Sequence, residues 1–478
     1  MSFTDVDATW KSWDAISYVV DANLMGGYPD SSFQPNNSVS VAEMAKIISL
    51  FLNAGKEIPS MPSENKKDKY RENSWASHYI DYCVRIGIPL GFFTGEIDQP
   101  VDNEKLEGMF IALAKHLNIS AEPMQRHFKE SFHAPTREDI ANLFYDFTKL
   151  YSAEVVKQID DGQYDDALQS IKDVQLCVPF LPSEIRRICQ HLFAKNRKNE
   201  NILFKYMLRI RACKKDVFSL SKKTKTVLHY TSLQALESLT KPGAKFQLSH
   251  VSHLNDPEEG SFGLKEAVEI FQDDNYKNFR KSWEEKKVRS VFVSSFSTAE
   301  NGRRIEDLPM WVHYGDQGKG CIIQFQVTSL EPEIYKVCYE PQEDSSENSF
   351  RGYIKNVKHI LDEYMKNNPS SARRNDDIVL FFAKESIEQA SYLYKSKYYS
   401  YEREARVLQI KSLTEATERE EIRAGESFPR LYTELDNSLE IKSITLGPKV
   451  KNPEHIIAVL IKRGIPSDKI YKSTVLYR

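Results

Sequence analysis

The first 150 residues of this 478-residue chain repeat one pattern, and it constrains the fold more than any other feature of the sequence. A tryptophan, a glycine turn and a proline follow one another at similar offsets in two successive stretches. The first stretch has Trp13, Gly26 and Pro35, and the second has Trp75, Gly87 and Pro100. Apolar residues flank each turn at helical spacing. The pattern predicts helix–loop–helix units that bury their apolar faces against their neighbours.

The repeats define how the chain should divide into domains. We expect an all-α module of three pseudo-repeats, the third truncated because it keeps little more than the run from Pro135 to Ile140. Apolar residues at helical spacing then predict a helical connector, and alternating strands and helices predict an α+β domain with its own core. The expected segments are 1–56, 57–118 and 119–150 for the repeats in 1–150, 151–216 for the connector and 217–478 for the α+β domain.

The repeats resemble S-layer homology (SLH) repeats, with which many bacteria hold proteins on cell-wall polysaccharide. The first copy carries the resemblance in Phe3-Thr4-Asp5-Val6, Gly26-Gly27-Tyr28-Pro29-Asp30 and Val41-Ala42-Glu43. In that family a Thr-Arg-Ala-Glu motif contacts the saccharide, and Thr136-Arg137-Glu138 resembles it. The first copy has no arginine there, and the second lacks the motif. The resemblance implies a saccharide or protein partner, and the alternative is that the repeats only pack together.

Several features bear on location and ligand class. The chain begins Met-Ser-Phe-Thr-Asp, without the basic and apolar start of a secretory signal, and its six cysteines form no Cys-x-x-Cys pair. We therefore expect a cytoplasmic protein, or a cell-surface one if a signal has been removed. No apolar run reaches the ~20 residues needed to cross a membrane. The net charge of −3 does not favour nucleic acid as the main ligand, and no ligand spacing predicts a metal.

The second half of the chain predicts short strands separated by helices. The expected strands are 227–230, 291–296, 321–325, 404–410, 443–447 and 474–477. No phosphate-binding loop of the usual pattern is present. The glycine-rich run from Gly315 to Gly320 leads into a strand, so we expect a turn there. Polar residues gather instead at the strand ends, for example around His229, Ser295 and Glu402.

The order of these polar motifs resembles a bacterial domain family of unknown function over about residues 225–478. It is also similar to abortive-infection proteins of the AbiGi type. Within it, His229, Ser295-Phe296-Ser297 and Glu402-Arg403-Glu404 follow the motif order of the mono-ADP-ribosyltransferases. That resemblance implies a split mixed sheet that holds NAD in a cleft. Glu404 would bind the ribose 2′-hydroxyl and stabilise the developing cation, and Glu402 would orient the acceptor.

The candidate site follows from that resemblance together with the strand-end motifs. Catalytic roles fall to Glu404, Glu402 and His229, and no residue is assigned to a metal. The expected NAD-binding residues are His229, Tyr230, Thr231, Ser295, Ser297, Trp311, Tyr314, Arg406 and Asn255. Strand alternation places Glu402, Glu404 and Arg406 on one face.

Two functions remain open at this point. The first is an NAD-consuming transferase or glycohydrolase effector, controlled by the repeat module and acting in anti-phage defence. The second is a non-enzymatic protein whose repeats bind saccharide or protein and whose C-terminal domain binds a nucleotide. The residues also permit simpler roles: Arg406 bridging the carboxylates as an ion-paired strand face, Trp311 and Tyr314 as core aromatics, and Asn255 in a turn.

Overall fold

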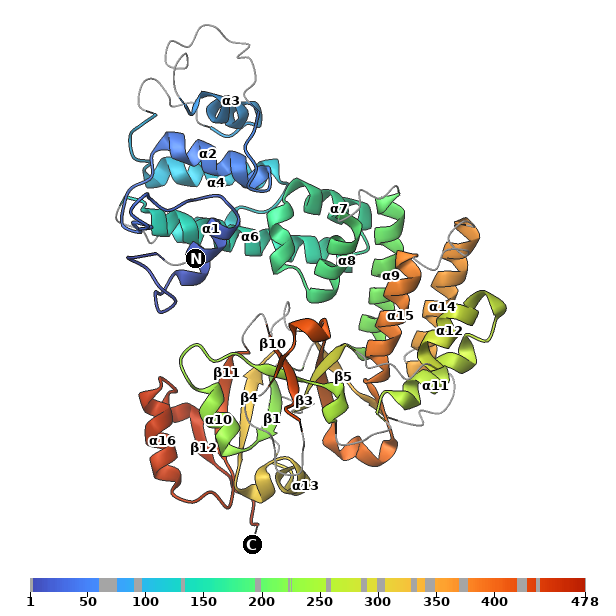
Figure 1. Cartoon of the computed structure of the whole chain (residues 1–478). Coiled ribbons are helices and arrows are strands. Elements are labelled where there is room, and N and C mark those ends of the chain that lie inside the picture. Colours follow the sequence, from blue (N-terminus) through green and yellow to red (C-terminus); the bar gives the residue numbers. More distant parts are fainter. Residues whose placement is uncertain are drawn as a thin grey trace. The chain divides into compact units, whose positions relative to one another are not determined.

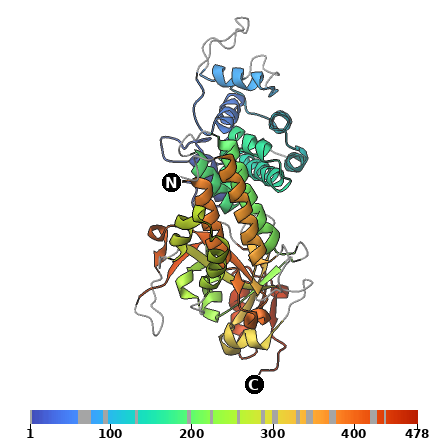
Figure 2. The same ribbon diagram turned by 90° about the vertical axis from the view of Figure 1, so that its right-hand side faces the viewer.

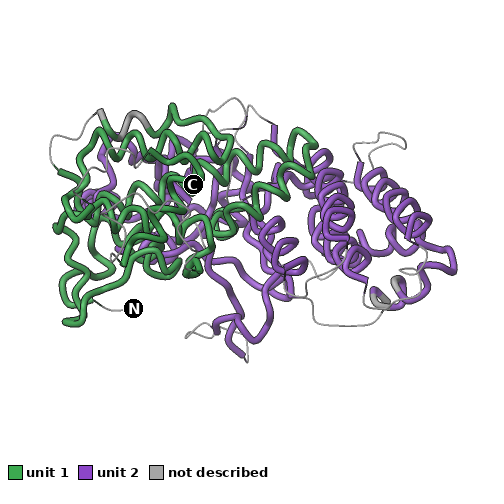
Figure 3. The backbone as a smooth tube through the Cα atoms, turned by 90° about the horizontal axis from the view of Figure 1, so that it is seen from above, with its two compact units in different colours: residues 1–181 green, residues 182–478 purple. Residues whose placement is uncertain are grey.

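The computed structural model divides the chain into two compact units, residues 1–181 and 182–478 (Figure 3). The protein is therefore multidomain, with helices in both units and a mixed sheet in the second. The structure describes residues 3–59, 75–89, 97–129, 134–193, 199–221, 224, 226–254, 259–284, 290–298, 306–327, 333–339, 349–368, 377–418, 428–435 and 439–477.

The division differs from the expected segments because one helix continues through the expected boundary at residue 150. Helix α6 (Arg137–Asp160) keeps its apolar face buried beyond that point, through Val155 and Ile159. The following elements α7 (Tyr164–Asp173) and η1 (Gln175–Phe180) stay with the first unit. The remaining part of the expected connector belongs to the second unit.

The described residues of the first unit contain three helix pairs that precede α7. They are α1 (Trp13–Asp21) with α2 (Val41–Leu52), α3 (Ser77–Arg85) with α4 (Asn103–His116), and α5 (Glu122–Lys129) with α6. The pairs interlock cyclically, since α2 packs on α3, α4 on α5, and α6 on α1. The third pair has both helices, so its expected truncation is wrong. Its first helix gave little sequence signal because Met124 and Phe128 are its buried apolar residues among those described.

The second helices of the three pairs meet at their N-termini and in an aromatic core. Ser40, Asp102 and Thr136 cap α2, α4 and α6, each accepting a backbone N–H three residues on. Isolated bridges join Ser38 to Thr136 and Ser40 to Pro100. The core contacts are between Phe51 of α2, Phe110 of α4, and Phe144 and Phe147 of α6, with ring centroids 5.1–5.9 Å apart.

The second unit combines a helical layer with a sheet. Its helices are α8 (Ser183–Phe193), α9 (Glu200–Phe218), α10 (Leu233–Leu239), α11 (Ser261–Ile270), α12 (Lys277–Glu284), α13 (Leu308–His313), α14 (Phe350–Asn367), α15 (Ile378–Ser391) and α16 (Pro453–Lys462). Figures 1 and 2 show α9, α14 and α15 side by side, and α9 also contacts the sheet at β5.

Ten strands of the described residues form one branched sheet, and two more form a separate parallel pair. The strands are β1 (Thr226–Thr231), β2 (Gln247–His250), β3 (Val291–Thr298), β4 (Cys321–Gln326), β5 (Ile334–Lys336), β6 (Cys338–Tyr339), β7 (Tyr394–Lys395), β8 (Glu404–Ile410), β9 (Thr417–Glu418), β10 (Leu431–Glu434), β11 (Ile441–Leu446) and β12 (Ile470–Lys472). The sheet is mixed, because β11 and β12 run parallel while the other pairs are antiparallel. Residues 474–477, expected as a strand, are irregular and follow the edge strand β12.

The sheet branches at β3. Strand β8 pairs along one edge of β3, whereas the other edge is shared: β2 pairs with Phe292 and Val293, and β1 pairs with Ser297 and Thr298. Strand β1 leaves β3 after Leu228, so no strand pairing is formed by the described residues on that edge between residues 294 and 296. This opening lies directly beside His229.

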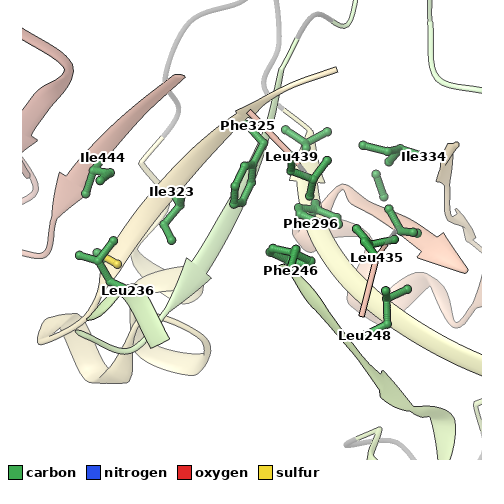
Figure 4. Packing of buried hydrophobic residues seen from close by; sticks show 14 of the residues in the cluster. Leu236, Phe246, Leu248, Phe296, Ile323, Phe325, Ile334, Leu435, Leu439 and Ile444 are labelled. Carbon is green, nitrogen blue, oxygen red and sulfur yellow. The ribbon is translucent and has the colours of Figure 1, made fainter. Parts of the chain in front are cut away.

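The alternation of side chains along β3 and β8 separates an apolar face from a polar one. Phe296 and Ala405 turn into the main apolar core, where Phe246, Phe325 and Ile323 pack (Figure 4). The neighbouring positions therefore turn to the opposite face. The residues on that face are Ser295 and Ser297 of β3 and, directly across from them, Arg406 and Glu404 of β8.

The glycine-rich run from Gly315 to Gly320 forms the expected turn. The backbone N–H groups of Gly318 and Gly320 both donate to the carbonyl oxygen of Gly315, at 3.0 and 2.9 Å. Because these two N–H groups donate within the turn, they do not point outward as the N–H groups of a phosphate-binding loop do.

Candidate functional site

A cavity of about 210 Å³ lies on the polar face of the sheet, where β1 diverges from β3. Eight of the expected site residues line it: His229, Tyr230, Ser295, Ser297, Tyr314, Glu402, Glu404 and Arg406. The rest of the wall is formed by Leu228, Leu254, Glu259, Phe296, Met310, Lys395 and Tyr399. Motifs that lie up to 177 positions apart in the sequence therefore meet at one place.

Two expected site residues lie elsewhere, and the structure does not describe a third. Trp311 is fully buried in a small apolar cluster, with its ring centroid 5.2 Å from that of Tyr230, because α13 packs this side chain against β1. Thr231 ends β1 opposite Cys321 and does not line the cavity. Asn255 falls outside the residues that the structure describes.

Glu402 reaches the cavity by a route that strand alternation did not predict. It ends the short helix η7 (Lys397–Glu402) and does not lie on β8. Arg403 then takes a left-handed conformation, with φ of +43°, and β8 begins at Glu404. Both carboxylates nevertheless turn into the cavity.

Glu404 is held as a carboxylate by two cations. Arg406 donates from Nε to Oε1 at 2.7 Å and from Nη2 to Oε2 at 2.9 Å, and Lys395 Nζ lies 3.3 Å from Oε2. Burial favours the protonated form, but the charges of Arg406 and Lys395 outweigh it and lower the pKa of Glu404. Both carboxylate oxygens therefore already have donors inside the protein.

The ion pairs extend to a third carboxylate. Arg406 Nη2 pairs with Glu259, and Nη1 donates to the carbonyl oxygen of Tyr392 at 2.6 Å. Arg406 thus bridges Glu404 and Glu259, not Glu404 and Glu402. Lys395 Nζ lies 2.7 Å from Glu402 Oε2 and 3.6 Å from Glu259 Oε1. Three carboxylates therefore share two cations.

Sequence reasoning missed both Glu259 and Lys395. Glu259 follows Asn255 by four positions, and the sequence offers only a turn as the simpler role of that stretch. Lys395 lies between Tyr394 and Ser396 in no recognisable motif, so no local signal marked it. Burial opposes its charge, but the neighbouring Glu404 and Glu259 raise its pKa above the usual lysine value.

His229 presents a defined tautomer to the cavity. Its Nδ1 lies 3.0 Å from the carbonyl oxygen of Ser295, which can only accept, so Nδ1 carries the proton. Burial lowers the pKa of the ring, although the Ser295 carbonyl opposes this shift. The neutral imidazole therefore leaves Nε2 as the acceptor nitrogen.

The cavity thus combines apolar and aromatic walls with a few fixed polar groups, as small-molecule sites do. Its volume is below the ~300–1,000 Å³ of pockets for drug-sized ligands, so it suits a ring and its attached sugar better than a whole dinucleotide. Among the described residues, no group of three or more His, Cys, Asp and Glu side chains is placed to hold a metal ion.

The first unit has a separate surface pocket of about 340 Å³ between its first and second repeats. Trp75 is 53 % exposed there, beside the carboxylates of Glu43 and Asp98. The other lining residues are Ser38, Ser40 and Pro100.

Arg137, which resembles the saccharide-contacting arginine of SLH repeats, is used inside the first unit. Its Nε donates to the carbonyl oxygen of Phe33 at 2.9 Å, and Nη2 donates to that of Gly26 at 2.6 Å. The guanidinium also lies over the rings of Tyr28 and Phe33. Because the side chain is buried, it supports the loop between α1 and α2.

Two family models match parts of the chain. An S-layer homology domain matches residues 2–45, and a protein of unknown function (DUF2971) matches residues 310–407. The second match includes Glu402, Glu404 and Arg406, but it begins after His229 and Ser295. The description of this family names no activity, so the resemblances to AbiGi-type proteins and ADP-ribosyltransferases stay predictions.

Curated relatives match over about 90 residues. A cellulosome-anchoring protein of Acetivibrio thermocellus is 37% identical over 93 residues, 19% of this chain and 21% of that protein. An S-layer protein of Bacillus licheniformis is 33% identical over 90 residues, and S-layer protein EA1 of Bacillus anthracis is 32% identical over 90. Each of these matches covers 19% of this chain and 10% of the relative. The chain thus spans about a fifth or less of the length of these relatives.

The SLH resemblance is therefore confirmed, and the expected cytoplasmic location is wrong. The matched domain and its S-layer and anchoring relatives point to the cell surface or cell wall. The expectation had rested on the first few residues, which say less than a matched domain. Over the residues that the structure describes, no helix is long and apolar enough to cross a membrane.

The pairing of Glu404 predicts a pH-dependent stability. Because its folded-state pKa lies below the usual 4.5, the ionised side chain stabilises the fold fully above about pH 4.5 and loses this effect as the pH falls through the folded-state value. Glu404→Gln should lower the free energy of unfolding by about 3 kcal/mol at pH 7, because it breaks a buried ion pair, and the deficit should shrink as the pH falls below about 4.5 and the wild-type carboxylate takes up a proton. Thermal melting of the full chain and of the variant, from pH 7 to below pH 4.5, measures this deficit.

Glu418→Gln is the matched control, since Glu418 is exposed on β9 and should tolerate the change at every pH. A Glu404→Gln deficit that stays constant with pH would contradict the ionised pairing.

Proposed function

We propose that this protein is held at the cell surface by its first unit and binds a nucleotide with its second. The matched S-layer homology domain supports a surface-anchoring role for the first unit. Trp75 suits saccharide binding, because an exposed ring offers a sugar a flat apolar surface, while Glu43, Asp98 and the two serines offer hydrogen bonds to hydroxyls. The partner proposed for this pocket is cell-wall polysaccharide.

Trp75→Ala should weaken binding of the full chain to purified cell-wall polysaccharide by about tenfold, since an aromatic anchor typically contributes more than 1 kcal/mol. Co-sedimentation at several polysaccharide concentrations measures the affinity. Phe428→Ala is the control, because Phe428 is an exposed aromatic residue of the other unit. An unaltered affinity in Trp75→Ala would reject this pocket, and a parent chain that does not sediment would reject anchoring.

For the second unit, the proposed ligand is NAD or a related nucleotide, bound through its nicotinamide riboside half. The observation that carries this proposal is the convergence of His229, Ser295 and Glu404 on one cavity at the branch in the sheet. Aromatic walls suit the ring, and the carboxylates and the His229 acceptor nitrogen suit ribose hydroxyls and the carboxamide. The remaining half of the dinucleotide would lie outside the cavity.

NAD should bind the full chain in isothermal titration calorimetry, and His229→Phe should weaken that binding by about tenfold or more. Phenylalanine keeps an aromatic ring but removes both nitrogens, and lost hydrogen bonds of this kind cost ~1–3 kcal/mol. His116→Gln, an exposed change in the first unit, should have no effect. If NAD and nicotinamide riboside both fail to bind the parent chain, the proposed ligand is wrong.

Cleavage of NAD is a second candidate function, favoured by one observation. Glu404 is kept ionised inside the cavity, as a carboxylate that stabilises an oxocarbenium-like ribose must be. The contacts of Arg406 and Lys395 with both of its oxygens oppose this role, since they leave less of its charge for a ligand. Binding without cleavage is therefore the function that the geometry supports better.

Release of free nicotinamide from NAD separates the two functions. If the site cleaves NAD, Glu404→Gln should retain the fold and slow release by several hundredfold, which corresponds to ~3–4 kcal/mol of transition-state stabilisation. Melting curves run in parallel identify a variant that has simply unfolded. If the parent chain binds NAD but releases no nicotinamide, cleavage is rejected and binding is the remaining function.

A further inference from the structure

The ionisable groups that line the cavity are unequal in charge. Glu259, Glu402 and Glu404 face Lys395 and Arg406, and every carboxylate lies within 4 Å of a cation. Burial lowers the pKa of His229 and raises the pKa of Tyr230 and of Tyr314, so these three residues of the wall are neutral at pH 7.

Among the described residues, a charged pair just outside the cluster does not correct this excess. Arg403 follows Glu402 in the chain, but its guanidinium lies 3.7 Å from the carboxylate of Asp307. This outer pair is balanced, so the described groups of the cavity leave one negative charge in a largely buried space. Few waters can screen a charge there, and its field acts more strongly than at the surface.

The aromatic walls also accept a positive charge. Lys395 Nζ lies 4.6 Å from the ring centroid of Tyr399, which lines the cavity. Tyr314 presents a second ring and donates its hydroxyl to Glu402 Oε1 at 2.7 Å. Faces of tyrosine rings attract cations, and this attraction increases where water is excluded.

We propose that the cavity selects a positively charged aromatic ring, such as a pyridinium, over a neutral ring of the same size and shape. This inference rests on the proposed nucleotide-binding function, and it specifies in addition that the bound ring carries a positive charge. NAD⁺ and NADH differ in this property at the nicotinamide ring, so the site would distinguish the oxidised form from the reduced form.

The decisive comparison uses nicotinamide riboside and its dihydro form, titrated into the full chain by calorimetry at one ionic strength. We expect the cationic riboside to bind at least about tenfold more tightly, as one uncompensated charge at close range implies. Glu402→Gln removes the excess charge and should reduce the ratio of the two affinities by about fivefold or more. Glu418→Gln removes the same kind of charge from the exposed strand β9, outside the cavity, and should leave the ratio at that of the parent chain.

A second pair of ligands makes the test independent of any variant that fails to fold. On the unaltered chain, 1-methylnicotinamide should bind more tightly than neutral nicotinamide. Equal affinities of the charged and neutral members in both pairs would overturn charge selection and leave nucleotide binding intact. Failure of all four ligands and of NAD to bind would instead reject the proposed function itself, and this inference with it.

Discussion

The second unit depends on one buried guanidinium. Arg406 is 2 % exposed, and it joins three parts of the chain: Glu404 on its own strand, Glu259 just before α11, and the carbonyl oxygen of Tyr392 at the end of α15. A buried charge is costly unless its donors are matched. The sheet and the helical layer therefore have to meet in one arrangement, and that arrangement creates the cavity.

The same interaction limits what the cavity can do. Glu404 is fixed and ionised because Arg406 and Lys395 contact it. The same contacts neutralise much of the negative charge with which Glu404 would stabilise a cationic transition state. Glu402 is held at both oxygens too, by Lys395 and by the hydroxyl of Tyr314. The ion-paired strand face expected as an alternative is present only in part: Arg406 pairs with Glu404, but its second partner is Glu259, and Glu402 pairs with Lys395. A cluster so fully paired is better suited to recognising a ligand than to transforming it.

Local patterns in the sequence predicted the helical repeats and most strands, because those depend on neighbours within a few positions. The strand expected over 404–410, for example, is β8. Burial of Trp311 could not be predicted, since an aromatic residue at a strand end suits a core as well as a pocket. Lys395 was missed for a different reason: its partners lie in two stretches of the sequence, at Glu259 and at Glu402 and Glu404, and no local motif predicts that they meet at this lysine.

The opening between β1 and β3 has a consequence for how the fold is maintained. Where two strands diverge, main-chain groups of a strand lose their usual partners and are expected to find others. At Ser295 the substitute is a side chain, since His229 donates to the carbonyl oxygen. The imidazole of one strand thus provides the hydrogen bond that main-chain pairing with β1 does not provide at this point. The side chain of His229 therefore has two constraints: it has to donate to the carbonyl oxygen of Ser295, and it has to form part of the cavity wall. A replacement that met only one of these constraints would alter the cavity.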